Sequence, residues 1–249
     1  MMLYDIATVF WRDWLVLKRR FTAFILSRMV APLLYLVAFG WGLGRSMNLS
    51  GGGSYLDFIV PGILALNSMN ISFNSVATPL SMSRLYHKTL EEYLLAPMRP
   101  IAFVVGKMLS SVVRGILSSF IILALAWVCG AQLQLGLLFW AVLTLNCLVF
   151  SSLGFVAAMV MESHEDMSHF STYVLLPMSF LCGTFFRTDS LPEAVRYVLE
   201  LLPLTHSSQL LRSYGAGGSG EGIAWLVLIV YWLLFMGLSV VTLRRLRKA

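Results

Sequence analysis

Six long apolar runs constrain the fold of this chain more than any other feature. A helix needs about 20 mostly apolar residues to cross the hydrocarbon core of a bilayer. Stretches of about this length or longer occupy residues 21–43, 55–80, 101–129, 135–161, 170–186 and 223–243. Only 12% of the 249 residues are charged, about half the share in a soluble domain. The sequence therefore predicts an all-α polytopic membrane protein, with six transmembrane helices in one domain spanning residues 1–249.

The distribution of Lys and Arg indicates which side of the membrane each loop occupies. Thirteen of the 18 lie in the segment through Arg28, in residues 83–107 and in the tail after residue 243. With six spans these regions share one side, which the positive-inside rule makes cytoplasmic. We expect both termini there. Because the cations cluster at the ends of apolar runs, the net charge of +6 does not indicate nucleic-acid binding.

Residues 1–20 have the pattern of an amphipathic helix. Trp11 and Trp14 fall on its apolar side, and Arg12 falls on its polar side. Tryptophan prefers the boundary between hydrocarbon and headgroups. We expect this helix to lie in the headgroup plane of the cytoplasmic leaflet, with the lipid bilayer as its partner.

Residues 83–97 form the longest strongly charged passage. Lys88 and Glu92 stand four residues apart, a spacing that places opposite charges together on a helix. Leu90 and Leu94 fall on another side, and Pro97 ends the helix. The segment is too short and too charged to span a membrane. It predicts a helix that presents a shaped surface to a cytoplasmic partner.

The passage before the last span suggests two short helices, at residues 190–215. Pro192 suits the first turn of one helix, and Pro203 separates it from the next. Their leucines are too apolar for a solvated loop. We favour a re-entrant hairpin, which is permitted where the backbone is buried in protein or lines a cavity. The alternative is two helices lying flat on the outer surface.

None of the candidate catalytic motifs in the sequence has the spacing that its chemistry requires. His164 and His169 are five residues apart, whereas a helical zinc site needs a spacing of four to bring both imidazoles to one face. A polar turn with helix-capping groups explains that stretch better. The sequence has no Walker A motif and no nucleophile elbow, so the chain is not expected to be an enzyme.

Three separated motifs resemble the ABC-2 type transporter permeases. They are T-L-E-E-Y-L-L-A-P-M-R-P at 89–100, P-M-S-F-L-C-G-T-F-F at 177–186, and S-L-P at 190–192 with P-L-T-H at 203–206. The resemblance covers nearly the whole chain. It is nearest to permeases of nodulation lipo-oligosaccharide exporters and of related drug or glycolipid exporters, although Arg187-Thr188 departs from the pattern of many relatives.

The resemblance implies a permease that exports an amphipathic substrate across the cell inner membrane as part of an ATP-driven complex. The substrate would be a glycolipid, lipo-oligosaccharide, polysaccharide or drug-like molecule. The permease would form a homodimer or pseudo-dimer of six-helix subunits and bind two copies of an ABC ATPase subunit. ATP and Mg²⁺ would bind to the ATPase, and this chain would hold no cofactor or metal.

The resemblance also implies roles for particular residues. Residues 1–20 become the interface helix, 83–97 the coupling helix and 190–215 the gate. The coupling residues are Lys88, Thr89, Leu90, Glu91, Leu94 and Pro97; the interface-helix residues are Trp11, Arg12 and Trp14; the gate residues are Leu191, Pro192, Leu199, Pro203 and His206.

A substrate path is harder to assign from the sequence. Aromatic side chains stack on sugars, but at helical spacing they more often pack in a core. The candidates are Tyr35, Phe39, Phe73, Tyr173 and Phe180, together with Arg114. Arg114 either faces a wet cavity with its neighbouring serines or marks a third span that enters the membrane later than drawn.

Two other classes of function stay open. An ion-coupled transporter or channel would need acidic residues within its spans, and only Asp57, at the outer end of the second span, qualifies. A membrane scaffold without transport activity is harder to exclude.

Overall fold

The computed structural model describes residues 2–38, 55–96, 98–181 and 193–247, whose regular structure is helical throughout. The helices are α1 (Met2–Arg19), α2 (Phe21–Tyr35), α3 (Tyr55–Leu85), α4 (Thr89–Leu95), α5 (Pro100–Val128), α6 (Leu137–Val160), α7 (His164–Phe170), α8 (Leu176–Leu181), α9 (Glu193–Glu200), α10 (Pro203–Gly215) and α11 (Gly222–Leu246), with a π-helical segment, Ser171–Leu175, between α7 and α8. The predicted all-α class is confirmed for these residues.

Five of these helices are long and apolar enough to cross a membrane: α2 continued to Ala38, α3, α5, α6 and α11. The fifth expected span, 170–186, is described only to Leu181, as the end of α7, the π-helical segment and α8. Pro177 explains the π-helical segment, because proline lacks an N–H and its ring clashes with the carbonyl four residues earlier. The rest of that span lies outside the described residues, so the count of six stays a prediction.

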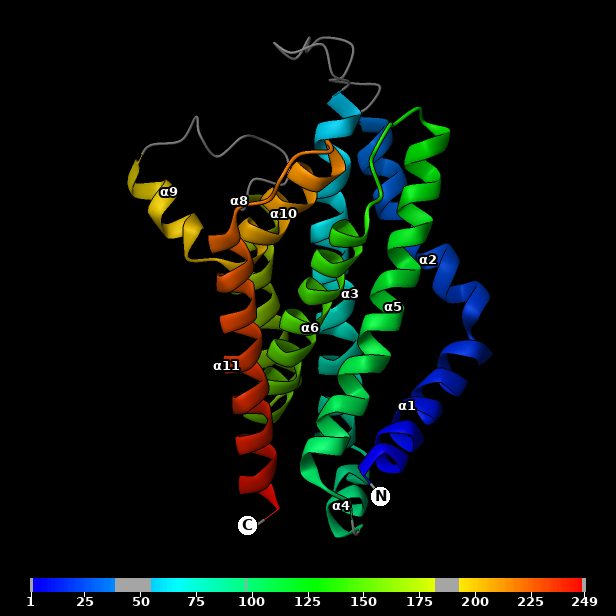
Figure 1. Ribbon diagram of the computed structural model, residues 1–249. Coiled ribbons are helices and arrows are strands. Elements are labelled where there is room, and N and C mark those ends of the chain that lie inside the picture. The colour runs from blue at the N-terminus through cyan, green and yellow to red at the C-terminus, as the bar shows by residue number, and fades with distance from the viewer. Residues whose placement is uncertain (1, 39–54, 97, 182–192, 248–249) are drawn as a thin grey trace.

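Helices α3 and α6 form the centre of the bundle, and α2 and α11 form its edges (Figure 1). Most of α3 and α6 is buried, whereas most of α2 and α11 is exposed. Exposed leucines and valines on those two edge helices, such as Leu34 and Leu233, suit a lipid environment.

Close packing and buried hydrogen bonds join the central helices. A Cβ atom added to Gly154 of α6 would lie 2.6 Å from the carbonyl oxygen of Phe73 on α3, so only glycine fits at that crossing. Asn146, fully buried, donates to the carbonyl oxygen of Ala65 at 3.1 Å and to Ser68 Oγ at 2.8 Å. Small residues and interhelical hydrogen bonds are how helices associate where lipid removes the hydrophobic drive.

The serines near Arg114 also belong to this packing. Ser111 donates to the carbonyl oxygen of Ser72 at 2.9 Å, and Ser118 accepts from Asn67 at 2.8 Å. Both serines are buried. They therefore join α5 to α3, and whether Arg114 itself faces a wet cavity stays a prediction.

The passage before α11 contains two helices with different surroundings. Helix α10 packs against α3, α6 and α11 and is largely buried, while α9 lies outside the bundle (Figure 1). Tyr197 and Val198 of α9 are exposed, and only Leu199 is buried among its described side chains. Two helices were predicted here, and the depth of α9 relative to a bilayer stays a prediction.

The turn before α7 has the predicted capping groups. Asp166 N donates to Ser163 Oγ at 3.0 Å, and Ser163 N donates to the Asp166 carboxylate at 3.1 Å. This reciprocal pair is a capping box, which confirms that the stretch around His164 and His169 begins a helix.

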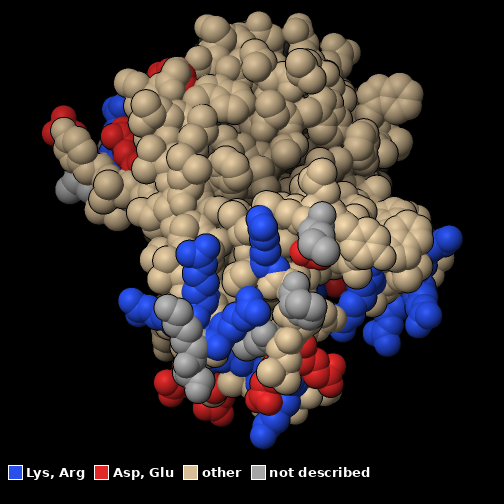
Figure 2. All heavy atoms as spheres, turned by 60° about the horizontal axis from the view of Figure 1, so that its bottom comes forward, with Lys and Arg blue, Asp and Glu red and all other residues tan. Residues whose placement is uncertain are grey.

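The start of α1, the whole of α4 and the end of α11 lie at one end of the molecule (Figure 1). Lys and Arg side chains gather at this end, and acidic side chains lie among them (Figure 2). Arg84, at the end of α3, contributes structurally here. Its Nη1 donates to the carbonyl oxygens of Ala158 and Met161, each at 3.1 Å, and so caps the C-terminus of α6.

Candidate functional site

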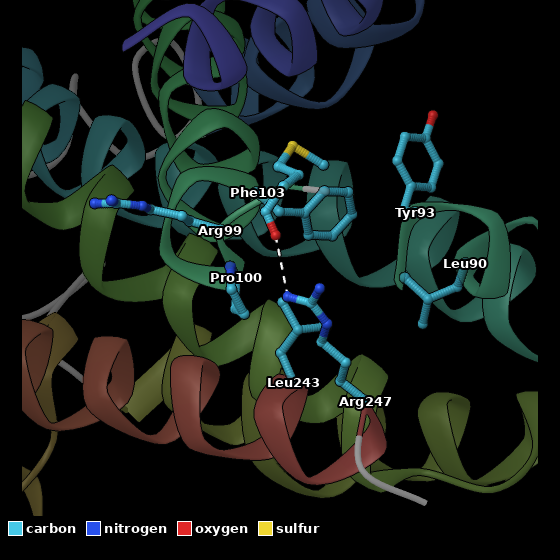
Figure 3. Close-up of a pocket in the computed structure, with 8 residues that line it drawn as sticks. Leu90, Tyr93, Arg99, Pro100, Phe103, Leu243 and Arg247 are labelled. Atoms are coloured by element: carbon cyan, nitrogen blue, oxygen red, sulfur yellow. Dashed lines mark hydrogen bonds between the residues drawn. The ribbon is translucent and has the colours of Figure 1, made fainter. Parts of the chain in front are cut away.

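Helix α4 is held against the bundle by residues from two spanning helices (Figure 3). A crevice between them is lined by Leu90 and Tyr93 of α4, Met98, Arg99, Pro100 and Phe103 around the start of α5, and Leu243 and Arg247 around the end of α11. The crevice holds about 10 Å³, room for about one water molecule. It is therefore a packed joint and not a small-molecule site.

Tyr93 connects α4 to two further elements. Its ring lies 5.3 Å from the ring of Phe103 on α5, measured between centroids. The same ring also contacts α1: the guanidinium carbon of Arg12 lies 5.0 Å from the Tyr93 ring centroid, a cation–π distance. Arg247 closes the joint by donating to the carbonyl oxygen of Met98 at 3.2 Å.

Helix α1 is fastened to α5 by an ion pair and a close contact. Lys107 Nζ lies 2.8 Å from both carboxylate oxygens of Asp13, and both side chains are largely buried. One turn away, a Cβ atom on Gly106 would lie 2.8 Å from the Cβ of Val9. The glycine lets α1 approach α5 closely enough for the ion pair to form.

The turn into α4 has an unusual backbone. Lys88, the residue before the helix, has φ 51° and ψ 10° and is the only non-glycine residue with positive φ in the described ranges. A left-handed conformation costs a side-chain-bearing residue about 1–2 kcal/mol. Packing of Leu90 and Tyr93 offsets this cost, since such conformations persist where the surroundings determine them.

The exposed face of α4 is the surface that a partner can touch. Lys88, Glu91 and Glu92 are exposed, as predicted for a charged face. Leu95 is 86% exposed and Tyr86 is 62% exposed. These five residues, here called the α4 tip, combine two apolar side chains with a charged rim.

Two predicted coupling residues of α4, Thr89 and Leu90, are not part of its exposed tip. Leu90 is 3% exposed and packs in the chain's own core, so it is not available to fill a groove in a partner, and that part of the prediction is wrong. Thr89 is half-buried. Pro97 lies outside the described residues, and the side chain of Leu94 is not described. Sequence reasoning missed Leu95, the apolar residue that does protrude.

The interface-helix residues fall on different sides of α1. Trp11 is exposed, Trp14 is half-buried, and Arg12 reaches Tyr93. Val9 and Leu17 are the buried positions. The helix thus has one face on α5 and another open to its surroundings, as the amphipathic pattern predicted.

A second candidate site is a cavity of about 310 Å³ between α2, α3 and the π-helical segment with α8. Amide and hydroxyl groups line one part of it, from Asn70, Asn74, Ser171, Thr172 and Ser179. Tyr35 and Phe180 supply aromatic rings, and Leu66, Leu175 and Leu176 complete the wall. Polar groups that converge in an otherwise apolar cavity are typical of binding sites.

Only two of the predicted substrate-path residues line this cavity, Tyr35 and Phe180. Phe73 is fully buried and stacks on Phe170, with centroids 5.6 Å apart, so its assignment to the path is wrong. Arg114 donates to the backbone carbonyl of Asp13 on α1 at 3.2 Å. Tyr173 is exposed and stacks on His169; Phe39 lies outside the described residues.

The P-L-T-H motif builds the corner between α9 and α10. Pro203 begins α10, where its missing N–H costs nothing. Thr205 Oγ1 donates to the carbonyl oxygen of Leu199 at 2.6 Å. Nε2 of His206 lies 2.8 Å from the carbonyl oxygen of Glu200, which requires a proton on that nitrogen. The two side chains satisfy the last carbonyls of α9.

Three of the five predicted gate residues, Leu199, Pro203 and His206, lie in this corner. Leu199 and Pro203 are buried. His206 lines a polar cavity of about 720 Å³ with Arg196, Glu200 and Glu221, among others. Leu191 and Pro192 lie outside the described residues.

The apolar helices and their packing define a multi-pass α-helical membrane protein. A family model described as "ABC-2 type transporter" matches residues 4–214. The chain therefore belongs to the ABC-2 type transporter family, as the three motifs predicted.

Named relatives agree with this assignment. Nodulation protein J of Rhizobium leguminosarum bv. trifolii is 30% identical over 238 residues, which cover 94% of this chain and 90% of that protein. Nodulation protein J of Rhizobium meliloti (strain 1021) is 30% identical over 203 residues, covering 81% and 77%. The inner membrane transport permease YadH of Escherichia coli (strain K12) is 25% identical over 205 residues, covering 78% and 80%.

Proposed function

We propose that this chain is the permease subunit of an ATP-driven ABC exporter in the cell inner membrane. The observation that carries the proposal is the α4 tip, which is exposed at the basic end of the molecule while Leu90 and Tyr93 anchor the same helix to α1, α5 and α11. Family membership and the names of the relatives, one an inner membrane transport permease, support it. ATP and Mg²⁺ would bind to a separate ATPase subunit present in two copies.

The α4 tip suits a protein partner for physical reasons. Leu95 provides an apolar centre that favours a pocket, and Lys88, Glu91 and Glu92 around it set register and orientation through charge. Because Leu90 is buried in the permease, movement of the tip is passed to α5 and α11 through packing. A freely mobile loop would transmit no such movement.

Replacing Leu95 with Asp should weaken ATPase binding at least tenfold. A charge in a closed apolar pocket loses its hydration without gaining a partner, and truncating the few residues that anchor an interface costs about 2 kcal/mol or more. The replacement Glu91→Lys should act in the same direction by reversing a rim charge. Copurification of the ATPase and the rate of phosphate release measure both effects.

The matched control is Leu137→Asp, because Leu137 is 87% exposed and lies at the start of α6, at the end of the bundle opposite to α4 (Figure 1). It should leave ATPase binding unchanged. Wild-type ATPase binding and phosphate release in both α4 variants would show that the tip is a solvated loop.

We further propose that the 310 Å³ cavity is part of the substrate path in a homodimer. The substrate would be an amphipathic molecule with hydroxyl-rich groups, such as a glycolipid, lipo-oligosaccharide, polysaccharide or drug-like molecule. Asn70 and Asn74 each donate one amide hydrogen to a backbone carbonyl in α3, at 3.1 and 2.8 Å. Their amide oxygens remain as acceptors for hydroxyl groups, and the rings of Tyr35 and Phe180 offer apolar faces for sugars.

Photocrosslinking from inside the cavity tests this assignment. A benzoylphenylalanine in place of Phe180 should capture a hydroxyl-rich amphipathic molecule in cells, identified by mass spectrometry of the permease. The same group in place of Leu233, an exposed residue of α11, should capture phospholipid only. Identical adducts at the two positions would contradict a substrate path in the cavity.

The proposed orientation places both termini and α4 in the cytoplasm and α9 at membrane depth on the outer side. Val198 is 59% exposed in the single chain, so its contact with water depends on whether α9 lies at membrane depth. Gly218, in the turn after α10, is also exposed. These two positions therefore separate a re-entrant helix from a surface helix.

Cysteine accessibility tests the orientation and the re-entrant helix together. In intact cells, a membrane-impermeant thiol reagent should label Gly218→Cys rapidly and Val198→Cys slowly. It should label Glu92→Cys, on the α4 tip, only after the membrane is opened. Equal rapid labelling at residues 198 and 218 would place α9 on the surface, and labelling of residue 92 from outside would reverse the topology.

A further inference from the structure

Four cations and one carboxylate gather where α1, α2 and α5 meet. The cations are Arg12 on α1, Arg28 on α2, and Lys107 and Arg114 on α5, and the carboxylate is Asp13. Arg114 lies within electrostatic range of Asp13 and Arg28, and Lys107 lies within range of Arg12 and Arg114. We call these five residues the cationic corner.

The one carboxylate in the corner is already engaged. Lys107 contacts both of its oxygens at 2.8 Å, and Arg114 reaches only the backbone carbonyl of Asp13, at 3.2 Å. The described part of the chain offers no acceptor to the buried Nε–H groups of Arg28 and Arg114. The corner therefore carries a formal excess of three positive charges and two buried donors without partners.

Such an arrangement is costly without an anion. Buried charges and donors are normally paired, and the two guanidinium groups repel each other. Arginine offers forked donors that match the oxygens of a phosphate. The chemistry of the corner thus favours a phosphate group with at least two accessible oxygens.

The position of the corner indicates where that phosphate comes from. Helix α1 is amphipathic, with Trp11 exposed on it, and α2 exposes apolar residues such as Leu26 and Val30 beside Arg28. Basic pockets between helices on the cytoplasmic side are suited to lipid headgroups. The corner shares no residue with the 310 Å³ cavity, which separates it from the proposed substrate path.

We propose that the cationic corner binds the phosphate of an anionic phospholipid from the inner leaflet, with its acyl chains lying along the exposed face of α2. The site rests on the proposed orientation of the chain but not on the identity of the substrate. The bound lipid contributes one negative charge, which pairs with Arg28 and Arg114, and joins α1, α2 and α5 at the membrane surface.

Native mass spectrometry of the purified permease tests this proposal, with phosphatidylglycerol and phosphatidylcholine of identical acyl chains as probes. The wild-type protein should retain phosphatidylglycerol in preference. Each interfacial cation strengthens binding about fivefold, so Arg28→Gln with Arg114→Gln should weaken phosphatidylglycerol binding about 25-fold. The matched control is Arg244→Gln with Arg245→Gln, which removes two exposed charges from α11 and should change binding no more than about twofold.

Further arms identify the source of the phosphate and guard against misfolding. The variant Arg28→Lys with Arg114→Lys keeps both charges but loses the forked donors, so it should bind phosphatidylglycerol more tightly than the Gln pair and less tightly than the wild type. Excess inorganic phosphate should leave the lipid bound, because the acyl chains add to its affinity; full displacement would assign the corner to free phosphate and overturn the lipid proposal. Equal binding of the two lipids to the wild-type protein would overturn it without any variant, as would equal losses in the Gln and control pairs.

Discussion

The ion pair between Asp13 and Lys107 is the interaction on which the basic end of the structure, with α1 and α4, depends. Both groups are largely shielded from water, where removing either partner costs about 3–5 kcal/mol because the other charge is left alone. The pair fixes α1 against α5, and Gly106 provides the space for the approach. With α1 in that position, Arg12 reaches Tyr93 and connects α1 to α4. The α4 tip, the joint and the cationic corner all depend on this contact.

The described spans argue for an external energy source. An ion-coupled transporter needs acidic groups at membrane depth, and the spans described here hold one carboxylate, Asp57. It lies in the first turn of α3 and accepts a hydrogen bond from the backbone N–H of Gln132 at 2.7 Å, a structural role. What the bundle does offer is a rigid connection from the α4 tip to α1, α5 and α11. Such a connection is useful when a separate ATPase subunit supplies the movement.

The length of the apolar runs and the spacing of apolar residues predicted much of the fold, because both follow from the geometry of a single helix. The apolar runs identified the spanning helices, and the prolines and caps located α4 and the α9–α10 corner. The direction of single side chains was harder to predict. A seven-residue helix has no strong face of its own, so Phe103 and Leu243 decide that Leu90 points inward and Leu95 outward. Phe73 was misassigned for a similar reason: Phe170, distant in sequence, determines its surroundings. The contact of Arg114 with the backbone of α1 could not be predicted from sequence either.

In the proposed permease–ATPase complex, α1 and α4 should move as one rigid body. Distances between paired spin labels in the permease–ATPase complex test it most directly, with labels on the exposed residues Lys18 and Glu92 and on Arg244 of α11 as the reference. Adding nucleotide should leave the distances from residue 92 to residue 18 and to the reference residue 244 unchanged and narrow in distribution, because the joint connects α4 to both α1 and α11. A distance between residues 18 and 92 that broadens or shifts with nucleotide would contradict a rigid joint.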